Sequence, residues 1–281
     1  MMGIVKRLSE RYRYSWVVLK EMVKTDFQLR YQGSFLGIAW SILKPLMLFC
    51  VMYMVFVRFL KFSDGTPTFP LVLLLGISLW NFFSEATSMG LNSITGRGDV
   101  LRKVDFPKII IVISATIGSL IGLAINMCVV LLFCLLSGQA HFTWRVLLLP
   151  INFIEFYILA LGCALLLATM NVYFRDIQHI WDVLQQTLFY ATPIIYPLSM
   201  VEQRLGEQYG PLIEKIMLLN PVAQIIQDIR HNLIAPDTTP TIWNLCHQWW
   251  IQLIPIAIVL LCVVLGLHVF KKHDWQFAEV L

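Results

Sequence analysis

The sequence predicts an all-α integral membrane protein with about six transmembrane helices. Of its 281 residues, 58% are hydrophobic and only 14% are charged, and the mean hydropathy is +0.72. Soluble domains average roughly 45–50% apolar and about 25% charged residues. Long apolar runs separate the charged residues, and each run can cross about 30 Å of hydrocarbon as a helix. Because so few charges cannot cover a water-exposed surface, lipid is the expected solvent.

Charged residues are scarce in every expected span. Soluble core helices rarely run this long without a polar face. Only Lys44 interrupts the first run, and only Glu155 interrupts the fourth. The expected spans are about Leu36–Phe59, about Pro70–Gly90, one within 109–140, one between Arg145 and Arg175, one between Asp182 and Glu202, and about Ile251–Phe270.

The distribution of basic residues predicts the orientation. The first thirty residues are basic and mixed, with no apolar stretch of signal-peptide length, so the N-terminus is expected in the cytoplasm. The cytoplasmic connections then carry most of the lysines and arginines, as the positive-inside rule requires. An even number of spans returns the tail to the same side. The expected parts are a cytoplasmic N-terminus at 1–35, a transmembrane domain at 36–270 and a cytoplasmic tail at 271–281.

Segment Tyr14–Arg30 is expected to form an amphipathic helix at the cytoplasmic interface. Asp26 and Arg30 are four residues apart, with the acid first, and can pair on such a helix. A plain positively charged anchor is the alternative. The apolar residues that recur at helical spacing are Trp16, Leu19, Val23 and Phe27.

The connection at 91–108 is longer than a minimal cytoplasmic loop needs to be. Gly96 and Gly98 mark a turn, and the residues after them can form a short helix with one apolar side. Pro107 suits the first turn of the next span, where its missing N–H costs nothing. This piece is expected to offer a docking surface to another protein, with a simple loop as the alternative.

The outer segment at 198–250 is expected to contain two short helices. Pro193 and Pro197 should break the end of the preceding span. Asn220 followed by Pro221 is a typical helix start. The predicted helices are Leu212–Leu219 and Pro221–Leu233. A solvated external domain is the alternative, but fifty residues bury too little area to fold alone.

Several chemistries are excluded or unsupported by the motifs. The chain has no GxxxxGK[ST], GxSxG or HExxH motif, so it carries no P-loop ATPase and no recognisable hydrolase site. Its basic residues flank apolar runs instead of forming the stripe typical of nucleic-acid binding. The six cysteines and six histidines are scattered, so no metal site is expected. Glu155 has two readings, a proton or pathway site and an interior carboxyl hydrogen-bonded to another helix.

Aromatic residues in three of the spans suggest a hypothesis about the transported molecule. A sugar has a C–H face and a hydroxyl rim, which suits an amphipathic ring. A corridor of rings could therefore pass a glycan, although packing and interfacial belts would also explain them. The residues assigned to this channel are Tyr53, Phe56, Trp80, Phe83, Phe189 and Tyr190.

Five segments resemble the polysaccharide-exporting ABC-2 permeases, in matching order and spacing along almost the whole chain. Within that family the resemblance is closest to exporters of streptococcal rhamnose-containing cell-wall polysaccharides. Exporters of O-antigen, capsule and teichoic acid are more distantly similar. The segments are KTDFQLRYQGSFLG at 24–37 running into AWSILKPL at 39–46, RGDVLRKVDFPK at 97–108, NVYFRDI at 171–177, ATPIIYP at 191–197 and LLNP at 218–221.

The resemblance implies a homodimer in the bacterial cytoplasmic membrane, with a central channel between the subunits and both termini cytoplasmic. It also implies two copies of a separate ABC ATP-binding subunit, which would hold ATP and Mg, so that this chain needs no cofactor. The substrate would be a lipid-linked polysaccharide. The implied contact with the ATP-binding subunit comprises Lys24, Asp26, Phe27, Arg30, Asp99, Leu101, Arg102, Lys103 and Phe106.

The resemblance also implies an outer gate and a place for the lipid diphosphate. Arg97, Arg102 and Lys103 are the expected diphosphate contacts, and ordinary positive-inside anchoring is their alternative role. The expected gate residues are Pro193, Tyr196, Pro197, Asn220 and Pro221.

Other functions compete with polysaccharide export. A small-molecule or drug exporter of the same superfamily would share the fold. A proton-coupled carrier built around Glu155 would move its substrate without an ATPase. A membrane-embedded glycosyl- or acyltransferase would need a polar catalytic cluster, for which the sequence gives no sign.

Overall fold

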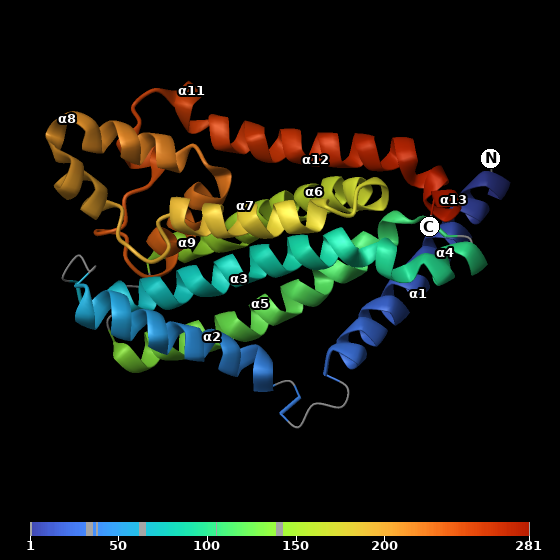
Figure 1. Cartoon of the computed structure of the whole chain (residues 1–281), viewed down its shortest axis with the longest axis horizontal. Helices are drawn as coiled ribbons and strands as arrows, with labels where there is room; N and C mark the ends of the chain where they lie inside the picture. The colour runs from blue at the N-terminus through green and yellow to red at the C-terminus, as the bar shows by residue number, and fades with distance from the viewer. Residues whose placement is uncertain are drawn as a thin grey trace.

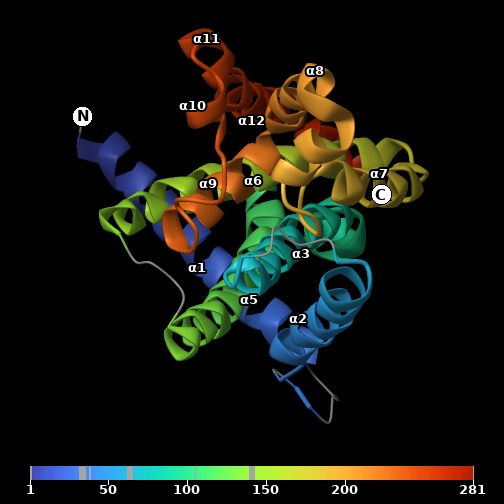
Figure 2. The same cartoon turned by 90° about the vertical axis from the view of Figure 1, so that its left-hand side faces the viewer.

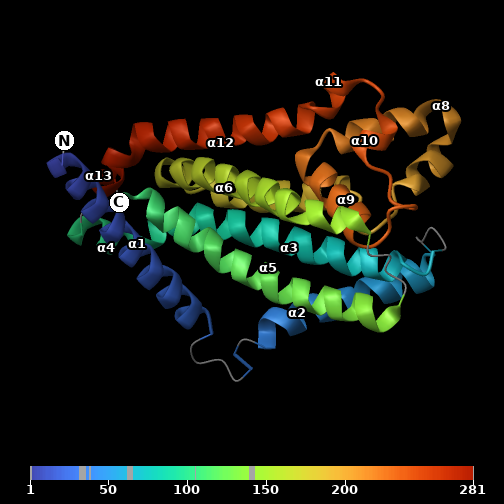
Figure 3. The same cartoon turned by 180° about the vertical axis from the view of Figure 1, so that it is seen from behind.

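The computed structural model describes residues 2–31, 36–37, 39–61, 66–104, 106–138 and 143–280, and these residues form a helical bundle (Figures 1 and 3). The long helices of the bundle are α2 (Ala39–Met52) with its continuation η1 (Tyr53–Phe59), α3 (Phe69–Ser93), α5 (Ile109–Ser137), α6 (Leu149–Tyr173), α7 (Ile177–Ala191) and α12 (Ile254–His273).

Shorter elements lie at both ends of the bundle, together with the long first helix. At the end that holds both termini, which we call the termini end, are α1 (Met2–Tyr31), η2 (Thr95–Arg97), α4 (Gly98–Lys103), η4 (Asp274–Gln276) and α13 (Phe277–Val280). At the opposite end, the far end, are η3 (Trp144–Leu148), α8 (Ser199–Leu218), α9 (Pro221–Leu233), α10 (Ile242–Leu245) and α11 (Trp249–Gln252) (Figure 2).

Five helical stretches are long and apolar enough to cross a membrane. They are Ala39–Phe59, Phe69–Ser93, Ile109–Ser137, Trp144–Tyr173 and Trp249–Gln276. Five of the six predicted spans are thus confirmed in place by length and composition. The chain is a multi-pass membrane protein.

The remaining predicted span, between Asp182 and Glu202, does not form one long apolar helix. Helix α7 has only 15 residues and contains Asp182, whereas a span needs roughly 20 apolar residues. It ends at Ala191, because Thr192 has an extended backbone and Pro193 follows. The total of six spans therefore stays a prediction.

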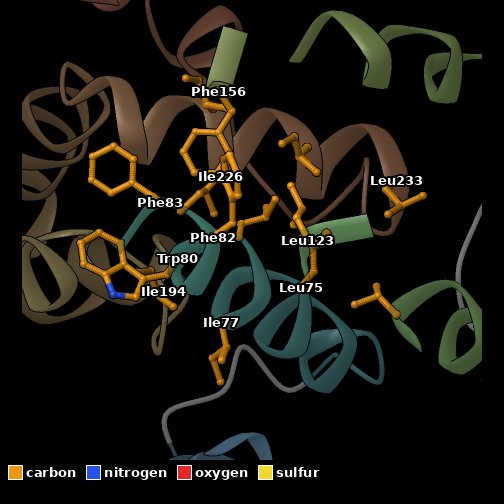
Figure 4. Packing of buried hydrophobic residues seen from close by; sticks show 14 of the residues in the cluster. Leu75, Ile77, Trp80, Phe82, Phe83, Leu123, Phe156, Ile194, Ile226 and Leu233 are labelled. Carbon is orange, nitrogen blue, oxygen red and sulfur yellow. The ribbon is translucent and has the colours of Figure 1, made fainter. Parts of the chain in front are cut away.

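Helix α3 is the centre of the bundle. It is buried along most of its length. Its aromatic residues pack against α6: the rings of Phe83 and Phe156 stack with centroids 6.0 Å apart, and Phe82 meets Phe156 edge-on at 5.3 Å. Figure 4 shows this cluster with Ile226 of α9 and Leu123 of α5 close by.

Small residues allow the helices to approach closely. A Cβ on Gly266 of α12 would lie 2.5 Å from the carbonyl oxygen of Gly162 in α6. A Cβ on Gly162 would lie 2.9 Å from the backbone nitrogen of Val263. In lipid, helix association depends on such close packing, because lipid tails are as apolar as the side chains.

The predicted helices of the outer segment are largely confirmed. Helix α9 has the predicted bounds, and the Asn220 side chain caps it by accepting from the N–H of Val222 at 3.1 Å. The predicted helix Leu212–Leu219 is the end of α8, which begins earlier, at Ser199. Gly206 has a φ of 77°, a left-handed conformation that bends α8 between two helical parts.

Replacing Gly266 by alanine should loosen the α6–α12 contact. The new methyl group would collide with backbone, so we expect unfolding in detergent to become easier by about 1–3 kcal/mol. The matched control is Gly118→Ala in α5, where a Cβ would meet nothing within 4 Å. Equal thermal stability of the two variants would contradict the close-packing account.

Candidate functional site

An ion pair fixes the long first helix to the termini end. Arg97 of η2 donates to the Asp26 carboxylate of α1 and, at 3.1 Å, to the hydroxyl of Ser114. The two paired side chains are only 21% and 15% exposed. The predicted Asp26–Arg30 pair involves a side chain outside the described set, and the structure gives Asp26 a partner on another element.

The predicted amphipathic helix is confirmed as a helix, and it packs on the bundle. Val18, Leu19 and Met22 of α1 lie against a buried cluster that includes Ile94 and Phe270. Trp16, assigned to the apolar face, is instead 67% exposed.

The residues predicted to contact an ATP-binding subunit divide into two groups. Leu101 and Phe106 are buried and hold the α4 connection against the bundle and α13, so they are not surface groups. Lys24, Asp99, Arg102 and Lys103 are exposed, and Phe27 is half-buried. Arg30 lies among the residues whose side chains are not described. The contact of these residues with an ATP-binding subunit stays a prediction.

A polar pocket of about 590 Å³ opens at the termini end, and we call it the termini-end pocket. It brings Arg102 of α4 together with Arg175, which follows α6. Of the predicted diphosphate contacts, only Arg102 lines it, since Arg97 is engaged with Asp26. The sequence reading missed Arg175, although it stands in the NVYFRDI segment. The lining residues are Asn92, Thr95, Gly96, Gly98, Asp99, Arg102, Asn171, Arg175 and Gln178.

Asn171 supports this pocket from α6. Its amide donates to the carbonyl oxygen of Leu91 at 3.1 Å and to the Thr95 hydroxyl at 3.4 Å. These bonds fix the end of α3 relative to the end of α6. The pocket is therefore built by two stretches that are far apart in sequence, 92–102 and 171–178.

A polar groove of about 470 Å³ runs between α2, α3 and α5, within the membrane-spanning part of the bundle. Ser78, Asn81, Ser84, Glu85 and Ser88 recur on one face of α3 at helical spacing. The opposite walls contribute Ser41 and Lys44 from α2 and Ser119, Gly122 and Asn126 from α5. The sequence carries a signal for this polar face, because hydroxyl and amide residues recur at helical spacing within a predicted span.

Two of the six predicted aromatic channel residues are buried inside the bundle. Trp80 and Phe83 are 7% and 2% exposed, and Trp80 contacts Phe189 at a centroid distance of 5.6 Å. Tyr190 is 61% exposed and meets Phe189. Tyr53 and Phe56 lie separately, on η1, where the Arg58 guanidinium covers the Tyr53 ring. The structure thus brings four of the six together, and a channel role for them stays a prediction.

The predicted outer-gate residues lie together at the far end. The Asn220 amide donates to the Thr192 hydroxyl at 3.3 Å, directly before Pro193. The Tyr196 hydroxyl donates to the carbonyl oxygen of Tyr190 at 3.0 Å. The segment between α7 and α8 is therefore bound to the start of α9. A gating role for it stays a prediction.

Arg230 of α9 holds the same segment from inside the protein. Its guanidinium donates to the carbonyl oxygens of Pro193 at 2.5 Å and Ile194 at 2.8 Å. Complete burial lowers the pKa of Arg230 to about 9. Gly76 of α3 leaves the room for this guanidinium, because a Cβ there would collide with it. The sequence reading treated Arg230 only as an outside charge.

Glu155 acquires an acidic neighbour that the sequence did not predict. The amide of Gln224 donates to Asp228 Oδ2 at 2.6 Å and shares a hydrogen bond with Glu155. Glu155 and Asp228 both line a cavity of about 390 Å³, the far-end cavity, with Arg145, His231 and Trp243. Burial raises the pKa of the Asp228 carboxyl from 3.8 to about 6.

Comparison with known proteins identifies the architecture. Residues 17–234 match the model of the ABC-2 type transporter family. The chain belongs to this family. ABC-2 permeases are the membrane subunits of transporters, which agrees with the multi-pass bundle and with the absence of ATPase motifs from the sequence.

The ABC-2 chain is similar along its whole length to curated permeases. It is 28% identical over 279 residues to the O-antigen export system permease protein RfbA of Myxococcus xanthus, with 98% of this chain and 99% of the relative covered. It is 25% identical over 271 residues to RfbA of Klebsiella pneumoniae, with 95% and 96% covered. The finer resemblance to streptococcal exporters stays a prediction.

Removing the charge of Asp26 should release α1 from the bundle. Asp26→Asn leaves Arg97 half-paired and should weaken the docking of α1 by about 1–3 kcal/mol. Hydrogen exchange of the α1 amides would measure this loss. Glu21→Gln, an exposed carboxylate on the same helix, should leave exchange unchanged. Equal protection in both variants would refute the anchoring role of Asp26.

The stability of the far end should depend on pH through Asp228. The pKa is higher in the folded state, so the folded protein binds more protons and is stabilised as pH falls through 6. Between pH 7 and pH 5 the gain should be about 1.4 kcal/mol. Asp228→Asn should lose this gain, whereas Asp237→Asn, an exposed position, should keep it. Unfolding in detergent at the two pH values would decide between these outcomes.

Proposed function

We propose that this ABC-2 permease is the membrane subunit of an ATP-driven exporter that moves a lipid-linked cell-surface polysaccharide across the bacterial cytoplasmic membrane. The observation that carries the proposal is its similarity, over 95–98% of the chain, to permeases named for O-antigen export. Similarity of this extent covers every element that could form a transport path, not one motif.

The proposed partners are a second copy of the chain and two ABC ATP-binding subunits. The chain contains no P-loop, so the energy must come from a bound protein. The termini end offers exposed charged groups on α1 and α4 for that contact. In this arrangement both termini face the cytoplasm, the far end faces outward, and α7 together with the segment that follows it provides the sixth crossing.

The polar groove supports a path for a hydroxyl-rich substrate. Serine and asparagine side chains can exchange hydrogen bonds with sugar hydroxyls, while lipid cannot. Lys44 and Glu85 are the charged groups that line the groove, so a neutral glycan meets few strong fixed charges. Weak, repeated hydrogen bonds would let a chain slide without being held.

The termini-end pocket supports a site for the lipid diphosphate. Arg102 and Arg175 could both donate charge-assisted hydrogen bonds to phosphate oxygens, and the neighbouring amides of Asn92 and Gln178 could add neutral ones. Arg97 is committed to Asp26, and the exposed Lys103 does not line the pocket, so we assign the diphosphate to Arg102 and Arg175.

A drug exporter would have the same fold, and a proton-coupled carrier would need no ATPase. The deciding experiment reconstitutes the chain with its ABC ATP-binding subunit in liposomes that contain lipid-linked glycan. ATP-dependent appearance of the glycan on the opposite face supports the proposal. Transport by this chain alone, without ATP, that Glu155→Gln abolishes would favour the carrier.

Replacing either pocket arginine should impair export. Arg102→Gln and Arg175→Gln should each lower the initial export rate about tenfold or more at limiting substrate, because each removes a charge-assisted hydrogen bond. Arg204→Gln, an exposed arginine at the far end, is the matched control and should export normally. Normal export by both pocket variants would remove the diphosphate assignment and leave the export function intact.

A further inference from the structure

The far-end cavity lies apart from the polar groove and from the termini-end pocket. Its walls come from η3, α6, α9, α10 and the start of α12. At about 390 Å³ it is much larger than the roughly 30 Å³ that one water molecule occupies in the liquid. Small-molecule sites begin at about 300 Å³. The cavity therefore has room for a ligand of monosaccharide size.

Two of the residues that line it each carry a buried carboxylate oxygen without a hydrogen-bond donor among the described residues. Asp228 is 4% exposed, and its Oδ2 already accepts from Gln224 at 2.6 Å and from the indole of Trp243 at 3.0 Å. Within the part of the chain that the structure describes, Asp228 Oδ1 and Glu155 Oε1 have no donor. A buried acceptor without a donor is unfavourable, so a ligand that donates a hydrogen bond to either oxygen would be stabilised here.

The rest of the wall supplies donors and a flat apolar surface. Arg145 is hydrogen-bonded to His231, and both line the cavity. The bond to Asp228 fixes the ring of Trp243, which is 44% exposed, at the cavity wall. Hydrogen-bond acceptors, hydrogen-bond donors and an indole ring thus line the same far-end cavity.

We propose that the far-end cavity binds one sugar residue of the exported polysaccharide. A pyranose ring carries hydroxyls that both donate and accept hydrogen bonds. It can therefore donate to the carboxylates of Asp228 and Glu155 while it accepts from Arg145. Its C–H face suits the ring of Trp243. This inference rests on the proposed function, which makes the far end the exit side.

Other ligand classes fit the wall less well. Within the described ranges, no group of three or more His, Cys, Asp or Glu side chains is placed to hold a metal ion. An anion would be repelled by two carboxylates, and an apolar molecule would leave both oxygens without donors. A compact cation would satisfy the carboxylates but would lie beside Arg145.

The first test measures sugar binding to the permease in lipid nanodiscs, with its ATP-binding subunit bound. The probes are methyl glycosides of rhamnose, mannose, galactose, glucose and N-acetylglucosamine, each added alone and followed by saturation-transfer NMR. A ligand of this size should bind with a Kd on the order of 1 mM. Asp228→Asn and Glu155→Gln should each weaken the best binder at least tenfold.

Glu214→Gln is the matched control, because Glu214 is a carboxylate of α8 that is 3% exposed and does not line the cavity. It should bind the glycoside as the wild type does. Failure of all five glycosides to bind, or equal binding by the Asp228 and control variants, would overturn the proposal.

A second measurement uses only the wild-type protein, so it remains valid if Asp228→Asn does not fold. A hydrophobic carbodiimide should label Glu155 and Asp228 in the wild type, and the best-binding glycoside should reduce their labelling without protecting Glu214, as read by mass spectrometry. Unchanged labelling at both cavity carboxylates would refute the site. A co-purified phospholipid that no glycoside displaces from the cavity would also refute it.

The two proposals can fail separately. ATP-driven glycan export with no glycoside binding would remove the far-end site and keep the function. Glycoside binding that depends on Asp228, in a protein that exports no glycan, would keep a sugar site and remove the export function.

Discussion

Close backbone contact around α3 is the constraint on which the rest of the structure depends. Because lipid tails are as apolar as the side chains, there is no hydrophobic driving force for helices to associate. The bundle therefore relies on small residues that let its helices pack closely. Gly90 of α3 packs on Ala164 of α6, and Gly162 with Gly266 brings α12 against α6. The polar pockets lie where helices separate, in the groove and at the two ends.

Each end of the bundle is closed by polar interactions between segments distant in sequence. At the termini end, Arg97 joins η2 to α1, and Lys108 donates to the backbone carbonyl of Asp274. At the far end, helix α9, buried from its second residue on, forms hydrogen bonds with the α7–α8 segment, with α6 and with α10. A movement of either end must exchange these bonds as a group, which suits a protein that passes between discrete states.

The proposed function would separate transport from recognition in space. The groove offers weak hydroxyl and amide contacts inside the spans, whereas the pockets at the two ends concentrate arginine, carboxylate and tryptophan. Strong contacts within the membrane would trap a long polymer. Stronger contacts at the ends can select a substrate without stopping its passage.

The sequence by itself determined the helical membrane class, the position of five spans, the bounds of α9, the break before Pro193 and the short helix that begins at Gly98. These features are local: they follow from runs of apolar residues, caps and prolines. It could not show that Arg97 pairs with Asp26, that Arg175 joins Arg102, or that Asp228 lies beside Glu155. Only the tertiary structure decided these contacts, because each joins residues separated by at least about seventy positions and depends on how helices cross.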